Sequence, residues 1–231
     1  MDSSTTSRIL TLDGTYSFYL PGSRGELIRA SALVADAVVA SGPVGPKTIN
    51  ALRAEGWDGT AIFDRADYAK GSRPGDVNRW FDEQQGAGAD RLLTPGCFVS
   101  SESGHLPFEA QVESEIKLAL VHDATCVLAI DYRWLTKSAQ HDEMLKLLRS
   151  LDCPVSLVLA DRGDPLSYPG AVNALIALTK RIEDVSLLRI DHAGVGALAF
   201  GAAHASIGLS AATSKGPRGV IFATSKGPPA G

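Results

Sequence analysis

CVLAIDYRWLTKSAQHDEMLKLLRSLDCPVSLVLAD, residues 126–161, is the stretch that decides the fold. It begins and ends with runs that are almost continuously hydrophobic, CVLAID (126–131) and VSLVLAD (155–161). Such runs are typical of parallel strands that are buried on both faces. Between them, residues 137–151 carry leucines and a methionine at helical spacing. The stretch therefore predicts a strand, a helix and a second strand parallel to the first.

The same rhythm extends in both directions along the chain. Further apolar runs occupy residues 8–13, 37–41, 60–65, 91–96, 185–191 and 205–210. Further helical patterns occupy residues 24–35, 46–56, 76–87, 109–122 and 170–182. Eight strands alternating with helices in 231 residues match a (β/α)8 TIM-type barrel of eight parallel strands, which typically has about 250 residues. An open, doubly wound parallel sheet shows the same alternation and is the alternative.

The connections favour the barrel. Helix-to-strand connections are short, such as WDG (57–59), whereas strand-to-helix connections are long and polar, such as RGDPLSYPG (162–170). In a barrel the strand-to-helix loops emerge on one face, and that face carries the active site. We therefore expect one barrel domain over residues 1–215 with a site at the carboxyl ends of its strands. The Gly/Pro/Lys-rich tail, residues 216–231, is typical of a disordered or poorly packed end.

Composition limits the function classes. The formal net charge of -4, with 45% hydrophobic and 21% charged residues, is ordinary for a soluble globular protein and disfavours nucleic-acid binding through charge. Glycine, serine and histidine interrupt the weakly polar stretch 191–217, so we expect no membrane span. The three cysteines, Cys97, Cys126 and Cys153, fit neither a disulfide framework nor a zinc motif. We expect a reducing, cytoplasmic location, predict no metal site and assign no cofactor.

Aspartate ends five of the eight apolar runs, at Asp13, Asp64, Asp131, Asp161 and Asp191. Carboxylates gathered at one rim of a barrel can act as general acid and base, as a nucleophile, or as ligands of a hard cation. Asp131 and Asp191 are the first candidates for catalysis, and Asp64 and Asp161 follow. The alternative for each is a helix cap or an acceptor that fixes a loop.

Three basic side chains accompany these aspartates. Arg65 and Arg133 follow Asp64 and Asp131 within two residues, and we expect them to bind an anionic ligand. His192 follows Asp191 and has two readings of equal weight, a base or phosphate donor and a helix-capping residue. No lysine ends an apolar run, which argues against Schiff-base chemistry.

The glycine-rich stretch 191–217 supplies the loops after the last two expected strands. Barrels frequently bind phosphate there, because glycine lets backbone N–H groups approach the ligand. We expect the ligand-binding residues to be Gly194, Gly196, Ser210, Ala211 and Lys215. The alternative is that the small residues only let a helix pack tightly on the barrel.

The sequence thus leads to a barrel enzyme that acts on a small phosphorylated or nucleotide-like molecule, with strand-end aspartates as acid and base or as nucleophile. A glycosyl or base transferase or hydrolase that uses paired aspartates is a second possibility. Two carboxyl groups about 5–5.5 Å apart would then favour nucleophilic attack. The rival from another class is a non-catalytic barrel that serves as a binding or scaffold module. The expected partner is a small, anionic molecule.

Overall fold

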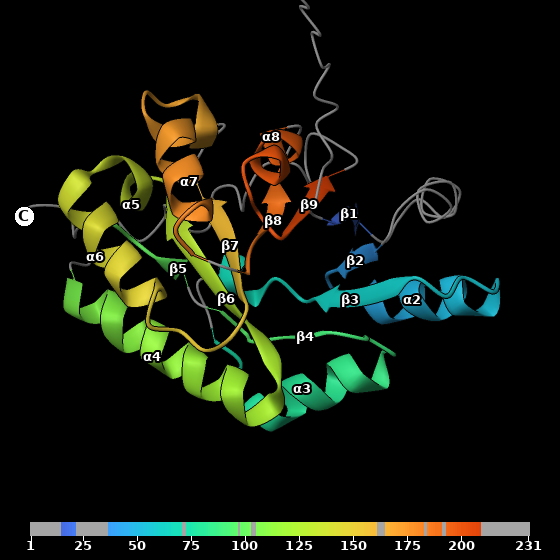
Figure 1. Cartoon of the computed structure of the whole chain (residues 1–231). Coiled ribbons are helices and arrows are strands. Elements are labelled where there is room, and N and C mark those ends of the chain that lie inside the picture. The colour runs from blue at the N-terminus through green and yellow to red at the C-terminus, as the bar shows by residue number, and fades with distance from the viewer. Residues whose placement is uncertain are drawn as a thin grey trace, which may run out of the picture.

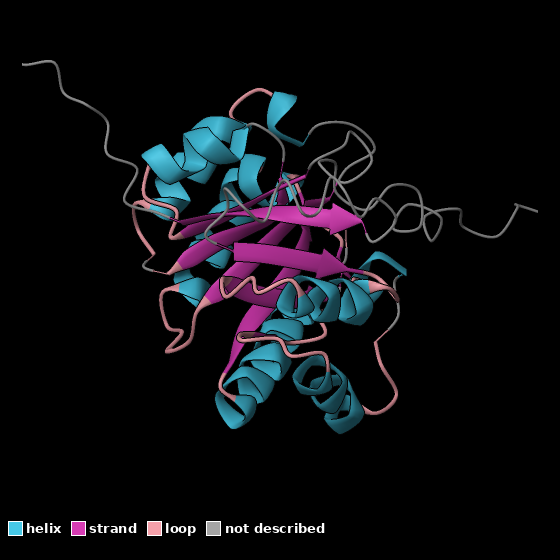
Figure 2. Cartoon of the chain, turned by 90° about the vertical axis from the view of Figure 1, so that its right-hand side faces the viewer, coloured by secondary structure: helices cyan, strands magenta, loops and turns pink. Residues whose placement is uncertain are grey.

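A computed structural model describes most of the chain (Figure 1). The described residues are 15–21, 37–70, 73–96, 98–102, 105–160, 165–182, 184–190 and 193–208. They form an α/β fold in which one curled parallel sheet is accompanied by helices on its outer side (Figure 2). None of the described helices is both long enough and apolar enough to cross a membrane.

The sheet has nine strand segments, and every pairing between them is parallel. They are β1 Thr15–Pro21, β2 Ala37–Ser41, β3 Thr60–Asp64, β4 Leu92–Leu93, β5 Phe98–Val99, β6 Ala124–Asp131, β7 Val155–Ala160, β8 Val185–Ile190 and β9 His204–Gly208. Their order is β3-β2-β1-β9-β8-β7-β6-β4, and β5 also pairs with β6. The two ends of this order, β3 and β4, are joined by a single bridge between Ile62 and Arg91.

The expected parallel α/β fold is confirmed, but a full eight-strand barrel is more than these residues show. Because one bridge replaces a ladder between β3 and β4, the described sheet is curled rather than continuously closed. The expected strand 8–13, the expected helix 24–35 and the tail 216–231 lie outside the described residues. Strand β1 was not predicted, because the hydroxyl-bearing residues of TYSFYLP interrupt any continuous apolar run.

The helices follow the sequence pattern closely. They are α2 Gly45–Ala54, α3 Val77–Gly86, α4 His105–His122, α5 Arg133–Thr136, α6 Ser138–Leu148, α7 Ala171–Thr179 and α8 Ala193–Ala199, with short 3-10 turns at Asp67–Lys70 and Pro165–Ser167. The predicted helices over 46–56, 76–87, 109–122, 137–151 and 170–182 are confirmed to within a few residues. Asp76 caps α3 as expected, because its side chain accepts a hydrogen bond from the backbone N–H of Arg79 at 3.1 Å.

The predicted strand 91–96 contains only β4, and β5 begins two residues after its end. Leu93 pairs with Thr125 and Phe98 with Ala129, so the four residues between Leu93 and Phe98 oppose three residues of β6. The extra residue is a bulge, and Gly96 within it has a φ of 67°, which a side chain disfavours. Because its ladder is short, β4 is fixed by hydrogen bonds from side chains.

Gln84 on α3 forms two of the hydrogen bonds that fix β4. Its amide donates to the carbonyl of Leu93 at 2.8 Å and accepts from the N–H of Leu93 at 2.8 Å. The indole N–H of Trp80 donates to the same carbonyl at 2.9 Å. The backbone N–H and carbonyl of Leu93 are thereby hydrogen-bonded, although β4 has only two residues.

The two faces of the sheet have different cores. The outer face packs against the helices in a large apolar cluster that includes Leu128, Leu157 and Trp134. The inner face carries a smaller cluster with one member from most strands: Val39, Ile62, Leu93, Val127, Val158 and Leu188. Because side chains alternate along a strand, residues two positions away from this layer also face inward at both ends of the strands. Those positions carry the polar side chains described below.

Candidate functional site

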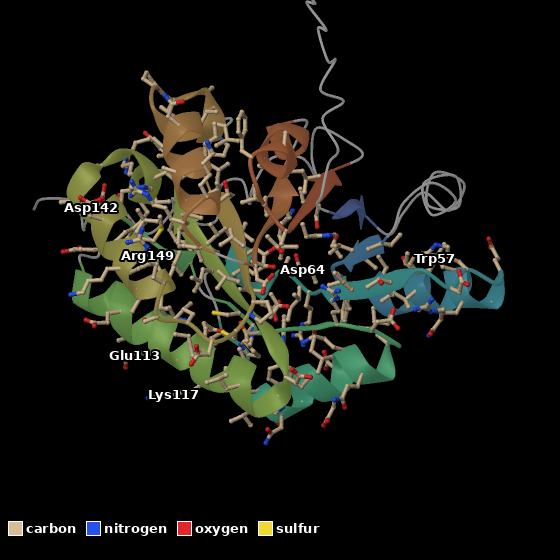
Figure 3. All side chains as sticks on the ribbon, in the orientation of Figure 1. Trp57, Asp64, Glu113, Lys117, Asp142 and Arg149 are labelled. Atoms are coloured by element: carbon tan, nitrogen blue, oxygen red, sulfur yellow. The ribbon has the colours of Figure 1, made fainter. Side chains whose placement is uncertain are left out.

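Asp64 and Asp131 lie at the carboxyl edge of the sheet. Asp64 is the last residue of β3 and pairs in register with Ser41, while Asp131 is the last residue of β6 and pairs with Ala160. Asp64 follows the inward-facing Ile62 by two residues, and Asp131 follows the inward-facing Ala129 by two. Figure 3 shows Asp64 toward the middle of the molecule. Strand alternation therefore brings both aspartates to the inner face at the same edge.

Asp64 is held from two sides. Its Oδ1 accepts a hydrogen bond from the backbone N–H of Ala66 at 2.8 Å, and its Oδ2 accepts one from the hydroxyl of Tyr68 at 2.6 Å. Ala66 has a φ of 58°, in the left-handed region that L-residues seldom adopt. Asp64 and Tyr68 are each 1% exposed. The carboxylate thus fixes the tight turn that leaves β3.

Asp131 repeats this arrangement and adds a charge. Its Oδ1 accepts from the backbone N–H of Arg133 at 2.9 Å, and its Oδ2 accepts from the hydroxyl of Ser101 at 3.1 Å. Oδ2 also lies 3.2 Å from Nη1 of Arg133, whose side chain is 39% exposed. Nη1 of Arg133 lies 3.7 Å from a carboxylate oxygen of Glu102. The charge of Asp131 is the largest cause that raises the pKa of Arg133.

Aromatic rings flank this ion pair. The guanidinium of Arg133 lies 5.5 Å from the centroid of the Tyr132 ring, and that ring stacks on Tyr168 with centroids 3.8 Å apart. Tyr132 and Tyr168 are both half-buried. Trp134, by contrast, is fully buried and stacks on Phe108 in the outer core at 4.1 Å. A charged group and a pair of tyrosines thus lie beside Asp131, where a planar ligand could contact them.

Arg65 is directed toward α3. Its guanidinium binds Glu83 at 2.6 Å and Asp67 at 3.0 Å, and it lies 5.3 Å from the ring centroid of Trp80. The structure therefore places Arg65 among side chains of the outer face and does not bring it together with Arg133. Its described contacts attach the loop after β3 to the neighbouring helix.

The glycines expected in a ligand-binding loop lie in a helix. Gly194 and Gly196 belong to α8, which begins at Ala193 rather than after the glycines. Gly196 is exposed, and no heavy atom of the described residues lies within 4 Å of the position that a Cβ atom would occupy. The other candidates lie outside the described residues: Asp161, Asp191, His192, Ser210, Ala211 and Lys215.

Sequence reasoning missed Glu115. It is fully buried on α4, where it accepts hydrogen bonds from the backbone N–H of Gly96 at 3.2 Å and from the amide of Gln111 at 2.9 Å. Arg73, from the loop after β3, binds it at 2.9 Å. Burial raises the pKa of Glu115, and this cause outweighs the hydrogen bonds and Arg73. The sequence did indicate a buried charge here, because Glu115 lies on the same helical face as the apolar Val112.

Metal ligands do not cluster in the part of the chain that is described. There, no three His, Cys, Asp or Glu side chains are placed to hold a metal ion together. The carboxyl edge as described is therefore a site of carboxylates, hydroxyls and one arginine.

The comparisons with known proteins assign no family. No family model matches the chain, and no curated protein matches it. Among solved structures, the chain is similar to the deoxyribose phosphate aldolase from Aeropyrum pernix, whose tetrameric structure is described as unique. The identity is 16%, the match covers 89% of this chain and 88% of that chain, and the TM-score is 0.48. A similarity this distant carries no activity over to this chain.

Proposed function

We propose that the curled sheet is a (β/α)8 barrel formed by one domain, residues 1–215. Three observations support this reading. The strand order follows the chain around a circle if β4 and β5 together count as one bulged strand. Its two ends meet at the bridge between Ile62 and Arg91. Polar residues lie at both ends of an apolar inner layer, as in filled barrels.

The barrel works, in this proposal, as an enzyme on a small phosphorylated or nucleotide-like molecule, with Asp131 transferring a proton at the carboxyl edge. The observation that carries the proposal is the setting of Asp131. Its carboxylate is 2% exposed and oriented by three donors, yet it adjoins a partly exposed arginine and half-buried tyrosines. General acid–base catalysis needs a side chain within hydrogen-bond reach of the reacting group, and this proposal places the ligand beside the fixed carboxylate of Asp131.

Each neighbour of Asp131 has a role in this proposal. Arg133 binds an anionic group of the ligand, since a guanidinium offers a planar fork of donors to phosphate. Tyr132 and Tyr168 pack against a ring of the ligand. In this proposal the segments that follow β7, β8 and β9 complete the site. They contribute Gly194 and Gly196 from α8, and also Asp161, Asp191, His192, Ser210, Ala211 and Lys215.

A cytoplasmic location is part of the same proposal. It is supported by the two described cysteines, Cys126 and Cys153, which are both free thiols.

A non-catalytic binding barrel is the second candidate, and one observation favours it. Both oxygens of Asp64 accept hydrogen bonds from the loop that it fixes, which is the work of a structural residue. Asp131 shares that pattern through Arg133 and Ser101. Such a protein binds its ligand at the carboxyl edge without turning it over.

Turnover by an Asp131→Asn variant separates the two candidates. The protein is incubated with pooled sugar phosphates, nucleosides and nucleotides, and proton and phosphorus NMR report any conversion. We expect wild-type turnover of at least one pool and a loss of about 100-fold or more in Asp131→Asn, the size of a general acid–base contribution. Asp142→Asn, the same change on the exposed side of α6 (Figure 3), should keep full activity. Equal turnover in the two variants would remove Asp131 from the chemistry, and binding without turnover would favour the second candidate.

A further inference from the structure

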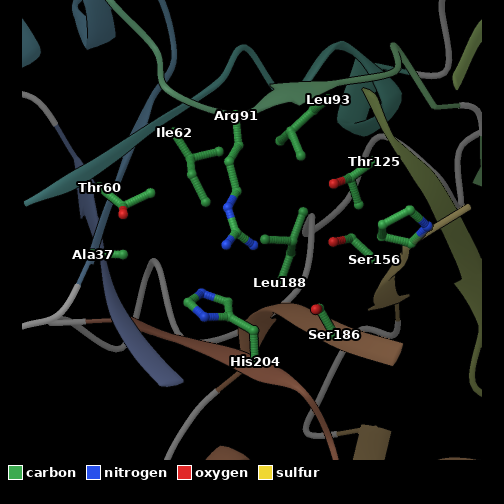
Figure 4. Close-up of a pocket in the computed structure, with 11 residues that line it drawn as sticks. Ala37, Thr60, Ile62, Arg91, Leu93, Thr125, Ser156, Ser186, Leu188 and His204 are labelled. Atoms are coloured by element: carbon green, nitrogen blue, oxygen red, sulfur yellow. The ribbon is translucent and has the colours of Figure 1, made fainter. Parts of the chain in front are cut away.

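A cavity of about 120 Å³ lies at the amino ends of the strands, opposite the aspartates (Figure 4). It is lined by residues from seven strands or the positions just before them. The residues that matter are Thr60, Arg91, Thr125, Ser156, Ser186 and His204. Neither the sequence patterns nor the proposed enzyme site accounts for this cavity.

The strand register gathers these side chains on the inner face. Ser156 pairs with Ser186, and Ser186 pairs with His204, so the three lie side by side across β7, β8 and β9. Arg91 approaches from the opposite wall, just before β4, at the bridge to Ile62. Figure 4 shows its guanidinium extending into the middle of the cavity, toward the serines and the histidine. Hydroxyls and one cation therefore converge on one space.

The charge in this cavity is not balanced by the described residues. The side chain of Arg91 has no hydrogen bond or ion pair with any other described residue, and no aspartate or glutamate lines the cavity. The adjacent Asp90 does not neutralise it, because its carboxylate binds Arg53 at 2.6 Å and the backbone N–H of Ala61 at 2.6 Å. An unpaired guanidinium in a pocket favours an anion.

The hydroxyls strengthen that preference. Those of Thr60, Thr125, Ser156 and Ser186 have no hydrogen bond to another described residue, so each is available as a donor. Ile62, Leu93 and Leu188 form an apolar floor that limits competition from water. A volume of about 120 Å³ is well above the minimum that one water needs, so the cavity has room for a small oxyanion.

We propose that the amino-end cavity binds a small oxyanion, either free phosphate or the phosphate of a compact ester, between Arg91 and the side chains of Ser156, Ser186 and His204. The site is distinct from the carboxyl edge. It also spans the weakest junction of the sheet, because Arg91 provides the single bridge to β3. Ligand binding ties that junction to β7, β8 and β9 and so stabilises the fold by mass action.

The test is thermal unfolding and calorimetric titration of the full chain with inorganic phosphate and, separately, glycerol phosphate. Sodium chloride at matched ionic strength is the reference for screening. We expect phosphate to raise the Tm of the wild type and to bind Arg91→Gln at least about 10-fold more weakly, the loss for one charge-assisted contact of about 1.4 kcal/mol. Ser186→Ala, which keeps the charge, is a second variant should Arg91→Gln fail to fold, and it should bind phosphate more weakly than the wild type.

Two comparisons locate the site. Arg79→Gln makes the same change at a side chain that is 76% exposed on α3 and should keep the phosphate response. Arg133→Gln removes the cation proposed for the carboxyl edge, so it reports any phosphate that binds there. The proposal is overturned if chloride reproduces the shift, if Arg91→Gln and Ser186→Ala both bind phosphate as the wild type does, or if only Arg133→Gln loses binding. The last result would place the anion at the carboxyl edge and leave the proposed enzyme intact. Binding of glycerol phosphate alone through Arg91 would identify an ester as the ligand.

Discussion

The two ends of the same strands use their inward-facing residues in opposite ways. At the carboxyl edge, Asp64 and Asp131 are negative, and each oxygen accepts a hydrogen bond from a nearby loop. At the amino end, the side chain of Arg91 is positive, and neither it nor the hydroxyls of Ser156 and Ser186 form a hydrogen bond to another described residue. The carboxyl edge is thus held together internally, whereas the amino end presents unused donors to a cavity.

This difference separates stability from binding. Removing a partner from a satisfied buried network leaves another polar group unpaired, which costs more than the lost bond itself. Removing a hydroxyl that faces a cavity leaves nothing unpaired. Substitutions at the carboxyl edge should therefore lower the free energy of unfolding, while substitutions at the amino end should change ligand affinity.

The largest expected effect tests that contrast directly. Asp64→Ala should lower the free energy of unfolding by about 2–3 kcal/mol, because the hydroxyl of Tyr68 and the N–H of Ala66 lose their acceptor. Ser156→Ala at the amino end should change it by less than about 0.5 kcal/mol. Urea unfolding measures both. Equal losses would mean that the hydroxyl at the amino end is structural.

A second prediction concerns the bulge beneath the carboxyl edge. A Cβ atom at Gly96 would lie 3.0 Å from Cγ1 and 3.2 Å from the carbonyl oxygen of Val127, at a φ of 67°. Gly42 has a similar φ of 70° with no heavy atom of the described residues within 4 Å of a Cβ position. Gly42→Ala should therefore cost about 1 kcal/mol from backbone strain, and Gly96→Ala about 2–3 kcal/mol from strain and crowding. Chemical denaturation of both variants separates the cost of backbone strain from the cost of crowding. Equal losses of stability would show that Val127 shifts to accommodate the new methyl group.

Glu115 gives a third prediction, with a defined sign. Its folded-state pKa is raised above the usual 4.5 chiefly by burial. Its contribution to stability is therefore fully present below about pH 4.5 and is lost as pH rises through the folded-state pKa. The wild type should lose stability relative to Glu115→Gln across that window, with a limiting slope of about 1.4 kcal/mol per pH unit for one proton. Urea unfolding of both proteins at several pH values measures the slope, and a constant difference would contradict the assignment.

The sequence predicted the elements of the fold better than their closure. Continuous apolar runs identified β2, β3, β6, β7 and β8, because strands buried on both faces leave that pattern. The pattern failed at β4 and β5, where a one-residue bulge and the side chain of Gln84 replace ladder hydrogen bonds. Bulges depend on tertiary contacts that a hydrophobic run does not encode.

The positions of the candidate site residues were predictable in part for a similar reason. A strand-end aspartate is visible in the sequence, so Asp64 and Asp131 were found together with their shared edge. Their hydroxyl partners were not, because Ser101 lies 30 residues from Asp131 in the chain. The amino-end cavity was missed because polar residues at the starts of the strands were not considered. Thr125, Ser156 and Ser186 each lie two residues before an apolar residue of the inner face.

The smallest expected effect concerns Gly196, the glycine of α8 that is proposed to contact the ligand of the carboxyl edge. Gly196 lies within α8, exposed, with no neighbour among the described residues near a Cβ position. Packing therefore gives no reason for glycine, and Gly196→Ala should stabilise the protein by about 0.5–1 kcal/mol through helix propensity alone. If the glycine is retained for the ligand of the carboxyl edge, the same variant should bind that ligand more weakly while its Tm rises. Gly86→Ala, an exposed helical glycine on α3 with equally open space, should gain stability and keep the affinity. Parallel thermal unfolding and ligand titration of the two variants decide the matter, since an unchanged affinity in Gly196→Ala would remove this glycine from the proposed site.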